Sequence, residues 1–449
     1  MPPSPSPRPA RAAPPPRDRG DACPGALRLH PAADGRLARV RLPAGDLTAR
    51  QATALGDAAH RLGDGHLSLT SRGNAELRGL ADDCGQELAG LLREAGLLPS
   101  ERHERLRNIL ASPLAGLDPH TPSDVRLWAR QLDTLLCTSP SATALSGRFL
   151  FVLDDGRGDV ATLGGDVTLV AAPGGALLRL GDGAALRIAG PDAARAALIA
   201  AGSFLAAAEA CGTGAWRVRE LPAPQVPTAH AVAADLRAAG IGAAYVAAPD
   251  PGAVPPGAGA TAPGITEAPD GRRALSVLAP LGRLTVDQWR LLTAIAAEDG
   301  AGELRTTPWR GVVVPGLPGA TAGARLRELA AAGLITDPGS PWHRISACTG
   351  RPGCAKSLSD VRADATAAVL RGSTPAPVGG LPVHWSGCER RCGHPHGSWI
   401  DVVATGAGDG GGTGEGGKDD RSAHGSDGPG LDGEPGYRVT VVRPTPTTP

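Results

Sequence analysis

Residues 46–80 read DLTARQATALGDAAHRLGDGHLSLTSRGNAELRGL, and residues 283–317 read RLTVDQWRLLTAIAAEDGAGELRTTPWRGVVVPGL. A shift of 237 residues aligns the two segments without a gap, and 11 of the 35 aligned positions are identical. The register continues outward through Pro43 and Pro280, and through the Gly-Leu pairs that begin at Gly96 and Gly333. The chain therefore carries an internal duplication. Two copies indicate a pseudo-twofold pair rather than a solenoid.

Both copies show the same order of predicted elements. In the first copy a strand near residues 37–42 precedes a helix over 48–62, which Thr48 opens as N-cap. Two short strands follow at 66–70 and 75–80, and a second helix over 87–95 stops at a glycine. This β-α-β-β-α order is ferredoxin-like. It predicts an α+β fold in which helices cover one face of a sheet.

Composition and pattern divide the remaining chain into further segments. We expect two duplicated ferredoxin-like repeats that form a pseudo-twofold domain, together with two α/β domains. The predicted boundaries are a disordered Pro-rich N-terminus at 1–24, repeat 1 at 25–118, α/β domain 1 at 119–248, a linker at 249–271, repeat 2 at 272–345, α/β domain 2 at 346–404 and 437–445, and a disordered Gly-rich insertion at 405–436.

The overall composition narrows the functional class. The 449 residues include 45 basic and 45 acidic side chains, so the chain lacks the polybasic character expected for binding nucleic acid or an anionic membrane. The first 20 residues contain no apolar core of a secretion signal. The longest apolar stretch, 198–208, is far shorter than the roughly 20 residues of a membrane span. We therefore expect a cytoplasmic protein.

Four of the eight cysteines are clustered in the pattern Cys348-x5-Cys354-x33-Cys388-x3-Cys392. In a cytosolic chain such a cluster indicates a metal or redox site rather than a disulfide framework. Thiolates suit either zinc or an iron–sulfur cluster. The x5 arm exceeds the spacing that structural zinc favours, and the surrounding glycines allow close backbone approach, which favours [4Fe–4S]. Zinc and unligated thiols remain alternatives at this point.

The cysteine pattern also carries a family resemblance. With Thr-Gly after the first cysteine and Ser-Gly before the third, it resembles the cluster signature of siroheme nitrite and sulfite reductases, whose fold joins paired ferredoxin-like repeats to two α/β domains. Residues 65–74, the Arg-Asn pair at 107–108 and the strand that begins at Arg148 resemble further motifs of that superfamily.

Within this superfamily the details resemble the precorrin-3B synthases. The matching segments are RNILASPLAGLDP at 107–119, LRG at 77–79 and TPWR at 307–310. The reductases commonly carry K-F-K or a close variant on the basic strand, where this chain has Arg148-Phe149-Leu150. Loss of the second positive charge would weaken a pocket for a small oxyanion.

The resemblance to precorrin-3B synthases implies an activity with its cofactors and partners. It implies an oxygen-dependent monooxygenase of aerobic cobalamin biosynthesis, which hydroxylates precorrin-3A and forms a lactone. It also implies a [4Fe–4S] cluster bound by the four clustered cysteines. No G-x-G-x-x-G fingerprint stands between a strand and a helix, so we expect an external NADH-linked electron donor. The catalytic residues are not identified by the sequence.

The implied substrate is a tetrapyrrole with eight carboxylates, which arginine recognises through two parallel hydrogen bonds. The alternative is that these arginines are solvated charges at strand edges. The candidate substrate-binding residues, all within or near the repeat motifs, are Arg72, Arg78, Arg107, Arg148, Arg305 and Arg310.

Two further questions stay open at the level of sequence. His394 and His396 are candidate ligands of an additional mononuclear non-haem iron, or ordinary histidines of a surface loop. In the reductases the cysteine that matches Cys392 bridges the cluster to the siroheme iron. The alternative functions are therefore a siroheme-dependent nitrite or sulfite reductase and a zinc-stabilised binding protein without catalytic activity.

Overall fold

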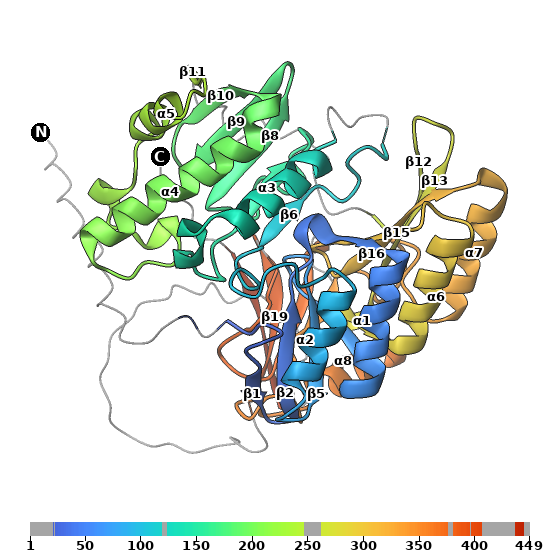
Figure 1. The fold of residues 1–449 in the computed structure, drawn as a ribbon. Coiled ribbons are helices and arrows are strands. Elements are labelled where there is room, and N and C mark those ends of the chain that lie inside the picture. Colours follow the sequence, from blue (N-terminus) through green and yellow to red (C-terminus); the bar gives the residue numbers. More distant parts are fainter. Residues whose placement is uncertain are drawn as a thin grey trace, which may run out of the picture. The chain divides into compact units, whose positions relative to one another are not determined.

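The chain is described by a computed structural model that covers residues 21, 23–118, 124–246, 262–375, 380–395, 397–405 and 436–443. It divides into two compact units. The first unit comprises Met1–Gly25, Arg41–Asp46 and Gly96–Ala260, and the second comprises Ala26–Val40, Leu47–Ala95 and Thr261–Pro449. Figure 1 labels the helices and many of the strands of both units.

The second unit contains both copies of the duplicated segment, and each copy builds the same set of elements. The first copy consists of β1 (His30–Ala32), β2 (Gly35–Val40), β3 (Asp46–Thr48), α1 (Ala49–Leu62), β4 (His66–Leu69), β5 (Ala75–Leu80) and α2 (Gly85–Glu94). The second copy consists of β12 (Gly264–Glu267), β13 (Arg273–Leu278), β14 (Arg283–Thr285), α6 (Val286–Glu298), β15 (Glu303–Thr306), β16 (Gly311–Leu317) and α7 (Gly319–Ala331).

Each copy contributes one short strand to the sheet of the other. The two five-stranded sheets have the orders β1-β2-β5-β4-β14 and β12-β13-β16-β15-β3, so β14 and β3 have changed places. Reciprocal backbone hydrogen bonds fix the exchange: Ala49 N donates to Gly302 O over 2.8 Å, and Val286 N donates to Gly65 O over 3.0 Å. The exchange joins the two copies through main-chain hydrogen bonds.

Local sequence explains why both copies adopt this geometry. Thr48 and Thr285 each open a helix with a capping box, in which the side chain accepts from the backbone N–H of the glutamine three residues later. The first helices of the two copies pack against each other at the centre of the pair. There Trp289 Nε1 donates to Ala52 O over 2.7 Å, between residues that occupy the same position in the two copies. Its indole lies 2.8 Å from where a Cβ on Gly56 would be.

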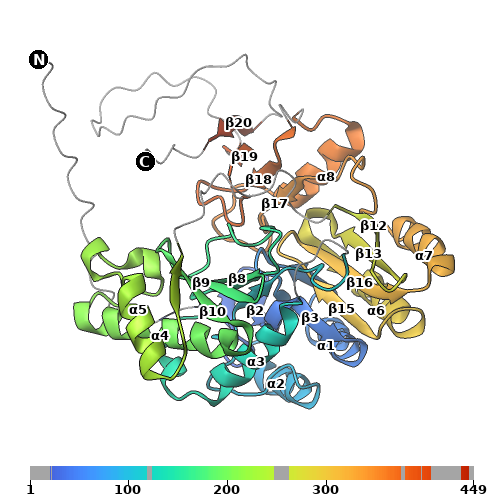
Figure 2. The ribbon, with the colours of Figure 1, turned by 90° about the horizontal axis from the view of Figure 1, so that it is seen from above.

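The cysteine-bearing segment adds a third sheet to the second unit. Its order is β17 (Ile345–Ala347), β18 (Val383–Ser386), β19 (Trp399–Ala404) and β20 (Tyr437–Val442), and α8 (Val361–Arg371) packs against it (Figure 2). The first three strands run parallel, and β20 pairs antiparallel with β19. Trp385, at 0% exposure, belongs to the core between this sheet and α8.

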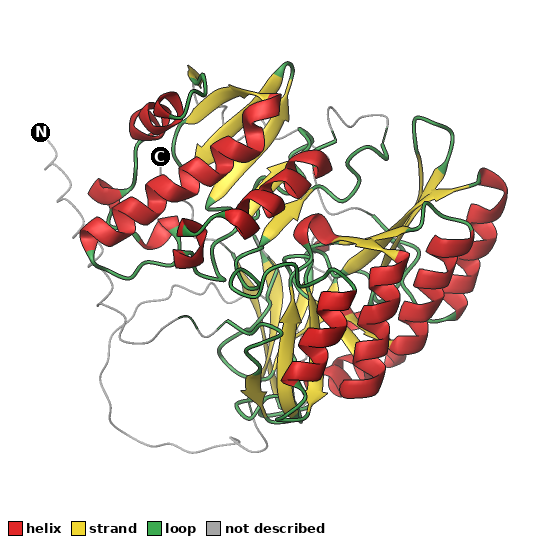
Figure 3. Cartoon of the chain, in the orientation of Figure 1, coloured by secondary structure: helices red, strands yellow, loops and turns green. Residues whose placement is uncertain are grey.

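The first unit is an α/β domain with one six-stranded sheet, in the order β11-β10-β9-β8-β7-β6. Its helices pack on the sheet and form a core with it (Figure 3). The strands and helices, in chain order, are β6 (Ile109–Ala111), α3 (Arg126–Thr138), β7 (Phe151–Asp154), β8 (Val167–Ala172), β9 (Gly175–Leu180), β10 (Ala185–Ala189), α4 (Ala193–Cys211), α5 (Ala229–Ala238) and β11 (Ala244–Val246).

One apolar segment of the first unit, Gly190–Cys211, is long and hydrophobic enough to cross a membrane by length and composition alone. It contains α4, which buries seven of its side chains, from Ala193 to Phe204, in the core of the unit. Burial of these side chains is typical of the central helix of a folded domain.

The structure confirms the predicted α+β class with duplicated ferredoxin-like repeats and places several boundaries differently. Residues 96–118 belong to the first unit because β6 pairs in parallel with β7. The predicted linker at 249–271 contains β12, whose Ile265 pairs with Leu275 of β13; its Gly- and Pro-rich flanks conceal the hairpin. Asp21, in the predicted disordered N-terminus, accepts hydrogen bonds from Ser146 Oγ and Gly147 N.

The remaining predictions of disorder stay predictions. Residues 1–20, residues 249–261 of the predicted linker and residues 406–435 of the predicted Gly-rich insertion lie outside the described chain.

Candidate metal centre

The four clustered cysteines lie on two loops that leave neighbouring parallel strands. Cys348 follows β17 and Cys388 follows β18, and because the strands are parallel, both loops begin at the same edge of the sheet. Cys348 N donates to Trp385 O over 2.9 Å, which extends the ladder by one residue. Cys354 lies further along the first loop, and Cys392 lies further along the second.

Backbone hydrogen bonds tie the two cysteine loops together. Leu358 N donates to Gly387 O over 2.8 Å, and Gly387 N lies 3.3 Å from Cys348 Sγ, to which it donates. Cys354 N donates to Gly350 O over 2.9 Å and closes the first loop on itself. The sequence predicts that glycines allow the backbone to approach closely around the cysteines. The structure agrees, since a Cβ on Gly387 would overlap Ser357 Oγ.

The four thiols are close enough to influence one another electrostatically. Burial is the largest cause that raises the pKa of the Cys348 thiol, and the neighbouring Cys388 and Cys354 raise it further. Hydrogen bonds from backbone N–H groups of the loops lower it in part. Burial also raises the pKa of Cys392, again with contributions from the other three cysteines. Thiolates gathered in this way repel one another, and a bound metal cation reverses that preference.

The spacing of the thiols distinguishes between zinc and a larger cluster. A tetrahedral zinc with Zn–S bonds of about 2.3 Å would place its sulfur atoms about 3.8 Å apart. All four cysteines lie in the described chain, and no three of their sulfur atoms fall within 4.8 Å of one another. The x5 spacing between Cys348 and Cys354 also exceeds the spacing that structural zinc favours. Four soft ligands on two neighbouring loops fit an iron–sulfur cluster.

Two of the predicted arginines contact the cysteine loops, one from each repeat. Arg78 on β5 is 6% exposed and donates through Nη2 to Gly353 O over 2.7 Å, while Asp34 and Glu76 hold the rest of its guanidinium. Arg310, at a positive φ of 59°, donates through Nη2 to Gly393 O over 2.6 Å. Each carbonyl belongs to the residue next to a cysteine. These arginines therefore position the loops that carry Cys354 and Cys392.

The other four predicted arginines lie in different surroundings. In the second unit Arg305 is 1% exposed and pairs with Glu303, and Arg72 lies half-buried in the turn between β4 and β5. In the first unit Arg107 is buried. Both oxygens of Asp133 bind it, at 2.6 and 2.8 Å, and Leu97 O accepts from it over 2.9 Å. Arg148 is exposed, with its guanidinium 5.0 Å from the centre of the Trp216 ring.

The described histidines near the cysteines form hydrogen bonds or stacking contacts with other residues of the chain. His384 is fully buried, and burial followed by repulsion from Arg310 lowers its pKa to about 3, so it is neutral. Its Nε2 donates to Cys392 O over 3.2 Å, and its Nδ1 accepts from Ser346 Oγ over 2.8 Å. His394 stacks on Trp399 and donates through Nδ1 to Pro395 O. His396 lies outside the described residues.

Sequence reasoning missed two residues that shape the site. Asp401, at 0% exposure on β19, binds the Nε of Arg391, which has a positive φ of 49° in the loop between Cys388 and Cys392. A lone aspartate in the apolar strand WIDVVA was the available signal. Arg362, in the first turn of α8, comes under the electrostatic influence of Cys348. The Ala-rich sequence of α8 is typical of a solvent-exposed helix, and no local pattern indicates that Arg362 is buried.

Comparison with known proteins identifies the repeated part of this chain. The profile of the nitrite/sulfite reductase ferredoxin-like half domain matches residues 30–95 and 266–332. These two ranges coincide with the duplicated elements of the second unit. The chain contains the nitrite/sulfite reductase ferredoxin-like half domain twice. The exchange of β3 and β14 therefore takes place between two half domains.

Longer similarities extend beyond the half domains. A precorrin-3B synthase from Sinorhizobium sp is 28% identical over 397 residues, which cover 87% of this chain and 82% of that protein. A ferredoxin–nitrite reductase from Synechococcus elongatus is 26% identical over 399 residues, which cover 81% and 75%. The Mycobacterium tuberculosis NirA protein shares the fold, with a TM-score of 0.65, 19% identity and coverage of 84% and 72%.

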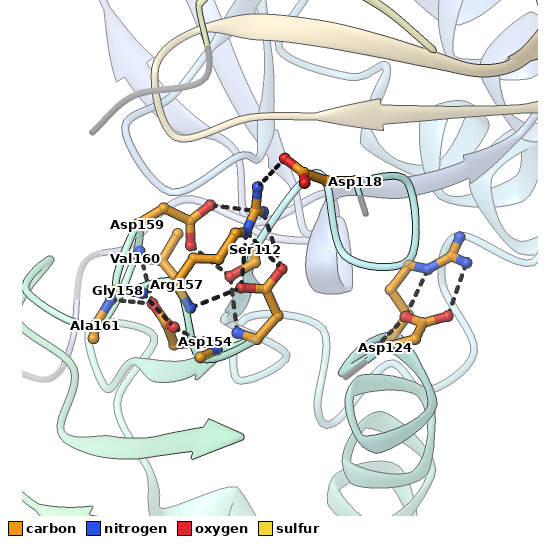
Figure 4. A network of polar contacts seen from close by, with 12 residues as sticks. Ser112, Asp118, Asp124, Asp154, Arg157, Gly158, Asp159, Val160 and Ala161 are labelled. Carbon is orange, nitrogen blue, oxygen red and sulfur yellow. Dashed lines mark hydrogen bonds and ion pairs between the residues drawn. The ribbon is translucent and has the colours of Figure 1, made fainter. Parts of the chain in front are cut away.

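Outside the half domains, the first unit contains a buried acidic cluster that Figure 4 shows in detail. Asp154, Asp155 and Asp159 have carboxylate oxygens within 4.8 Å of one another. Asp154 accepts four backbone N–H groups of the following loop, at 2.8 to 3.0 Å. The guanidinium of Arg157 pairs with Asp155 at 2.9 Å and with Asp159 at 3.4 Å, and supplies the positive charge that a metal would otherwise bring. Arg157 and the four backbone N–H groups offset part of the negative charge, and the cluster anchors this loop.

The first prediction concerns close packing at the metal centre. Gly387→Ala would force Cβ into Ser357 and separate the two cysteine loops. We expect the purified variant to lose most of its iron and acid-labile sulfide. Gly90→Ala on α2 meets no atom within 4 Å and is the matched control, with iron content equal to wild type. Equal iron in both variants would contradict this account of the loops.

The second prediction concerns the pH dependence of stability. Burial, opposed by the hydrogen bond from Ser112, raises the pKa of Asp159 to about 7. A carboxyl whose pKa is raised in the folded state favours folding at low pH and loses that contribution as pH rises from about 4 to 7. Between pH 5 and 8, the free energy of unfolding of the wild type should fall by on the order of 2 kcal/mol more than that of Asp159→Asn.

Urea denaturation at pH 5 and pH 8 measures this difference. Asp182→Asn, which changes a carboxyl in a turn of the same unit, is the control and should follow the wild type. Parallel pH profiles for the wild type and Asp159→Asn would show that Asp159 does not titrate in this range.

Proposed function

We propose that this protein is a precorrin-3B synthase, which hydroxylates precorrin-3A with dioxygen and closes a lactone in aerobic cobalamin biosynthesis. The proposal includes an external NADH-linked electron donor and a cytoplasmic location, where clustered thiols stay reduced. Cys348, Cys354, Cys388 and Cys392 would hold a [4Fe–4S] cluster. When bound, that cluster would supply the single electrons that dioxygen chemistry requires.

The observation that carries the proposal is the four-thiol site, whose two loops are joined by hydrogen bonds and supported by an arginine from each half domain. It supports an iron–sulfur oxidoreductase. The similarity to the Sinorhizobium precorrin-3B synthase over 87% of the chain supports the tetrapyrrole substrate.

The alternative is a siroheme-dependent nitrite or sulfite reductase, which two observations support. The Synechococcus ferredoxin–nitrite reductase is similar over 81% of the chain, and Cys392 is the exposed member of the four cysteines, so its sulfur could contact a second group. Leu150 favours the synthase instead. It is 2% exposed, and its N–H donates to Asp166 over 2.9 Å. A core leucine stands where the reductases commonly place a second basic residue.

The contacts of each predicted arginine indicate whether it has a structural role or is available to bind a ligand. Arg107 uses three of its N–H groups on Asp133 and Leu97. Arg148 is exposed, and its guanidinium lies over an aromatic ring, which orients it at little entropic cost. We therefore propose Arg148 as the first-unit residue best placed to bind a substrate carboxylate. Arg78 and Arg310 act mainly on the cysteine loops, and Arg305 acts within its sheet.

The test of the proposed function uses the full chain purified without oxygen. We expect iron and acid-labile sulfide in equal amounts, about four of each per chain, broad visible absorption and no haem bands. Precorrin-3A, dioxygen and a reductant should then yield a hydroxylated lactone by mass spectrometry. Strong siroheme bands with nitrite or sulfite reduction would establish the alternative instead, and zinc without sulfide would exclude both enzymes.

The assignment of the cluster ligands has its own test. Cys354→Ser should lose the visible absorption and most of the iron, because one of four ligands is gone. Cys211→Ser is the matched control, since Cys211 ends α4 in the first unit and lies 3.5 Å from Thr213 Oγ1. It should keep the iron content of the wild type. The same iron content in both variants would refute the ligand set.

A further inference from the structure

Arg362 lies beside the metal centre because of how α8 begins. Asp360 caps the helix by accepting from Ala363 N over 3.1 Å. Val361 then packs on the first cysteine loop, with its Cγ2 only 2.8 Å from where a Cβ on Gly350 would be. The start of the helix is therefore fixed against that loop. Arg362, the next residue, is within electrostatic reach of Cys348.

The charges around Arg362 leave it without an acidic partner. Its electrostatic neighbours are Arg283, Arg78, Glu76 and Cys348. Glu76 already binds Arg39 at 2.9 Å and Arg78 at 3.2 Å, and Arg283 is paired with Asp64 at 2.6 Å. Within the described chain no carboxylate forms an ion pair with Arg362. A guanidinium that is largely buried among other guanidiniums is costly until an anion balances it.

The guanidinium of Arg362 is nevertheless open to a ligand. Its Nε is buried and has no hydrogen-bond partner, whereas the two terminal nitrogens keep contact with solvent. Burial, together with repulsion from Arg283 and Arg78, lowers the pKa of Arg362 to about 10, which still leaves it charged at neutral pH. An incoming carboxylate would find a fixed cation with its Nη face accessible and two further positive charges close by.

We propose that Arg362 anchors a carboxylate-binding site beside Cys348, with Arg283 and Arg78 adding positive charge, and that its ligand is one acidic side chain of the tetrapyrrole. This inference rests on the proposed tetrapyrrole substrate. A planar guanidinium with both terminal nitrogens accessible binds a carboxylate through two parallel hydrogen bonds. The site would hold the periphery of the macrocycle next to the cluster loops, on the side of the first half domain.

The probe for the test is uroporphyrin, a tetrapyrrole with eight carboxylates, with its octamethyl ester as the uncharged counterpart. Both are titrated without oxygen into full-length protein that contains its cluster. Arg362→Gln should weaken binding of the acid by about tenfold or more and leave the ester unchanged. Arg362→Lys should fall between them, because lysine keeps the charge without the paired hydrogen bonds.

Arg327→Gln is the matched control, since Arg327 is an exposed arginine of α7 in the same unit. It should bind the acid as the wild type does. Iron and sulfide are measured in every variant, and Arg362→Gln is expected to retain both. The proposal is overturned if Arg362→Gln binds the acid as tightly as wild type, or if it weakens acid and ester equally. Loss of the cluster in Arg362→Gln would also overturn it, because Arg362 would then serve the cluster.

The same measurements separate this inference from the proposed enzyme activity. Arg362-dependent binding of the acid in a protein that does not convert precorrin-3A would support the carboxylate site and refute the synthase. If the protein converts precorrin-3A but Arg362→Gln binds uroporphyrin as tightly as the wild type does, the synthase is supported and the carboxylate site is refuted.

Discussion

The exchange of β3 and β14 between the two half domains is the constraint on which the metal centre depends. Its main-chain hydrogen bonds, Ala49 to Gly302 and Val286 to Gly65, make each sheet incomplete without the other copy. Arg78 comes from one sheet, and Arg310 comes from the turn before β16 of the other. Their guanidiniums reach carbonyls on different cysteine loops only if the two sheets keep a fixed relation. The exchange therefore holds together the two sheets whose arginines contact the cysteine loops.

The electrostatics of the site follow from the same arrangement. Burial and the neighbouring cysteines raise the pKa of the Cys348 and Cys392 thiols, so these two need compensating positive charge before they can ionise. A bound metal would supply part of that charge. Arg310 and Arg362 lie near the loops, and no carboxylate in the described chain forms an ion pair with either of them. The surroundings of the cysteines are thus suited to anions, whether these are thiolates or the carboxylates of a ligand.

Much of this fold was predictable because the duplication is visible in the sequence. Thr48 and Thr285 mark the same helix start. The spacing of the four cysteines predicts a metal site, and the structure places them on two loops that follow neighbouring strands. The strand exchange was not predictable, because a three-residue strand looks the same whichever sheet it joins. The hairpin at β12 lay hidden among glycine and proline. Arg362 was missed because burial of a helix charge depends on tertiary neighbours, and nothing local to the helix reveals it.

Trp289 shows how far the two copies have become interdependent. It meets Ala52, its own counterpart, at the centre of the pair, and Gly56 leaves room for its indole. A pair made of two second repeats would place two tryptophan indoles at this position, where they would clash. A pair made of two first repeats would place only alanine there and leave a void. Neither repeat could now form this interface as a symmetric homodimer. The two copies have therefore diverged into complementary partners within a single chain.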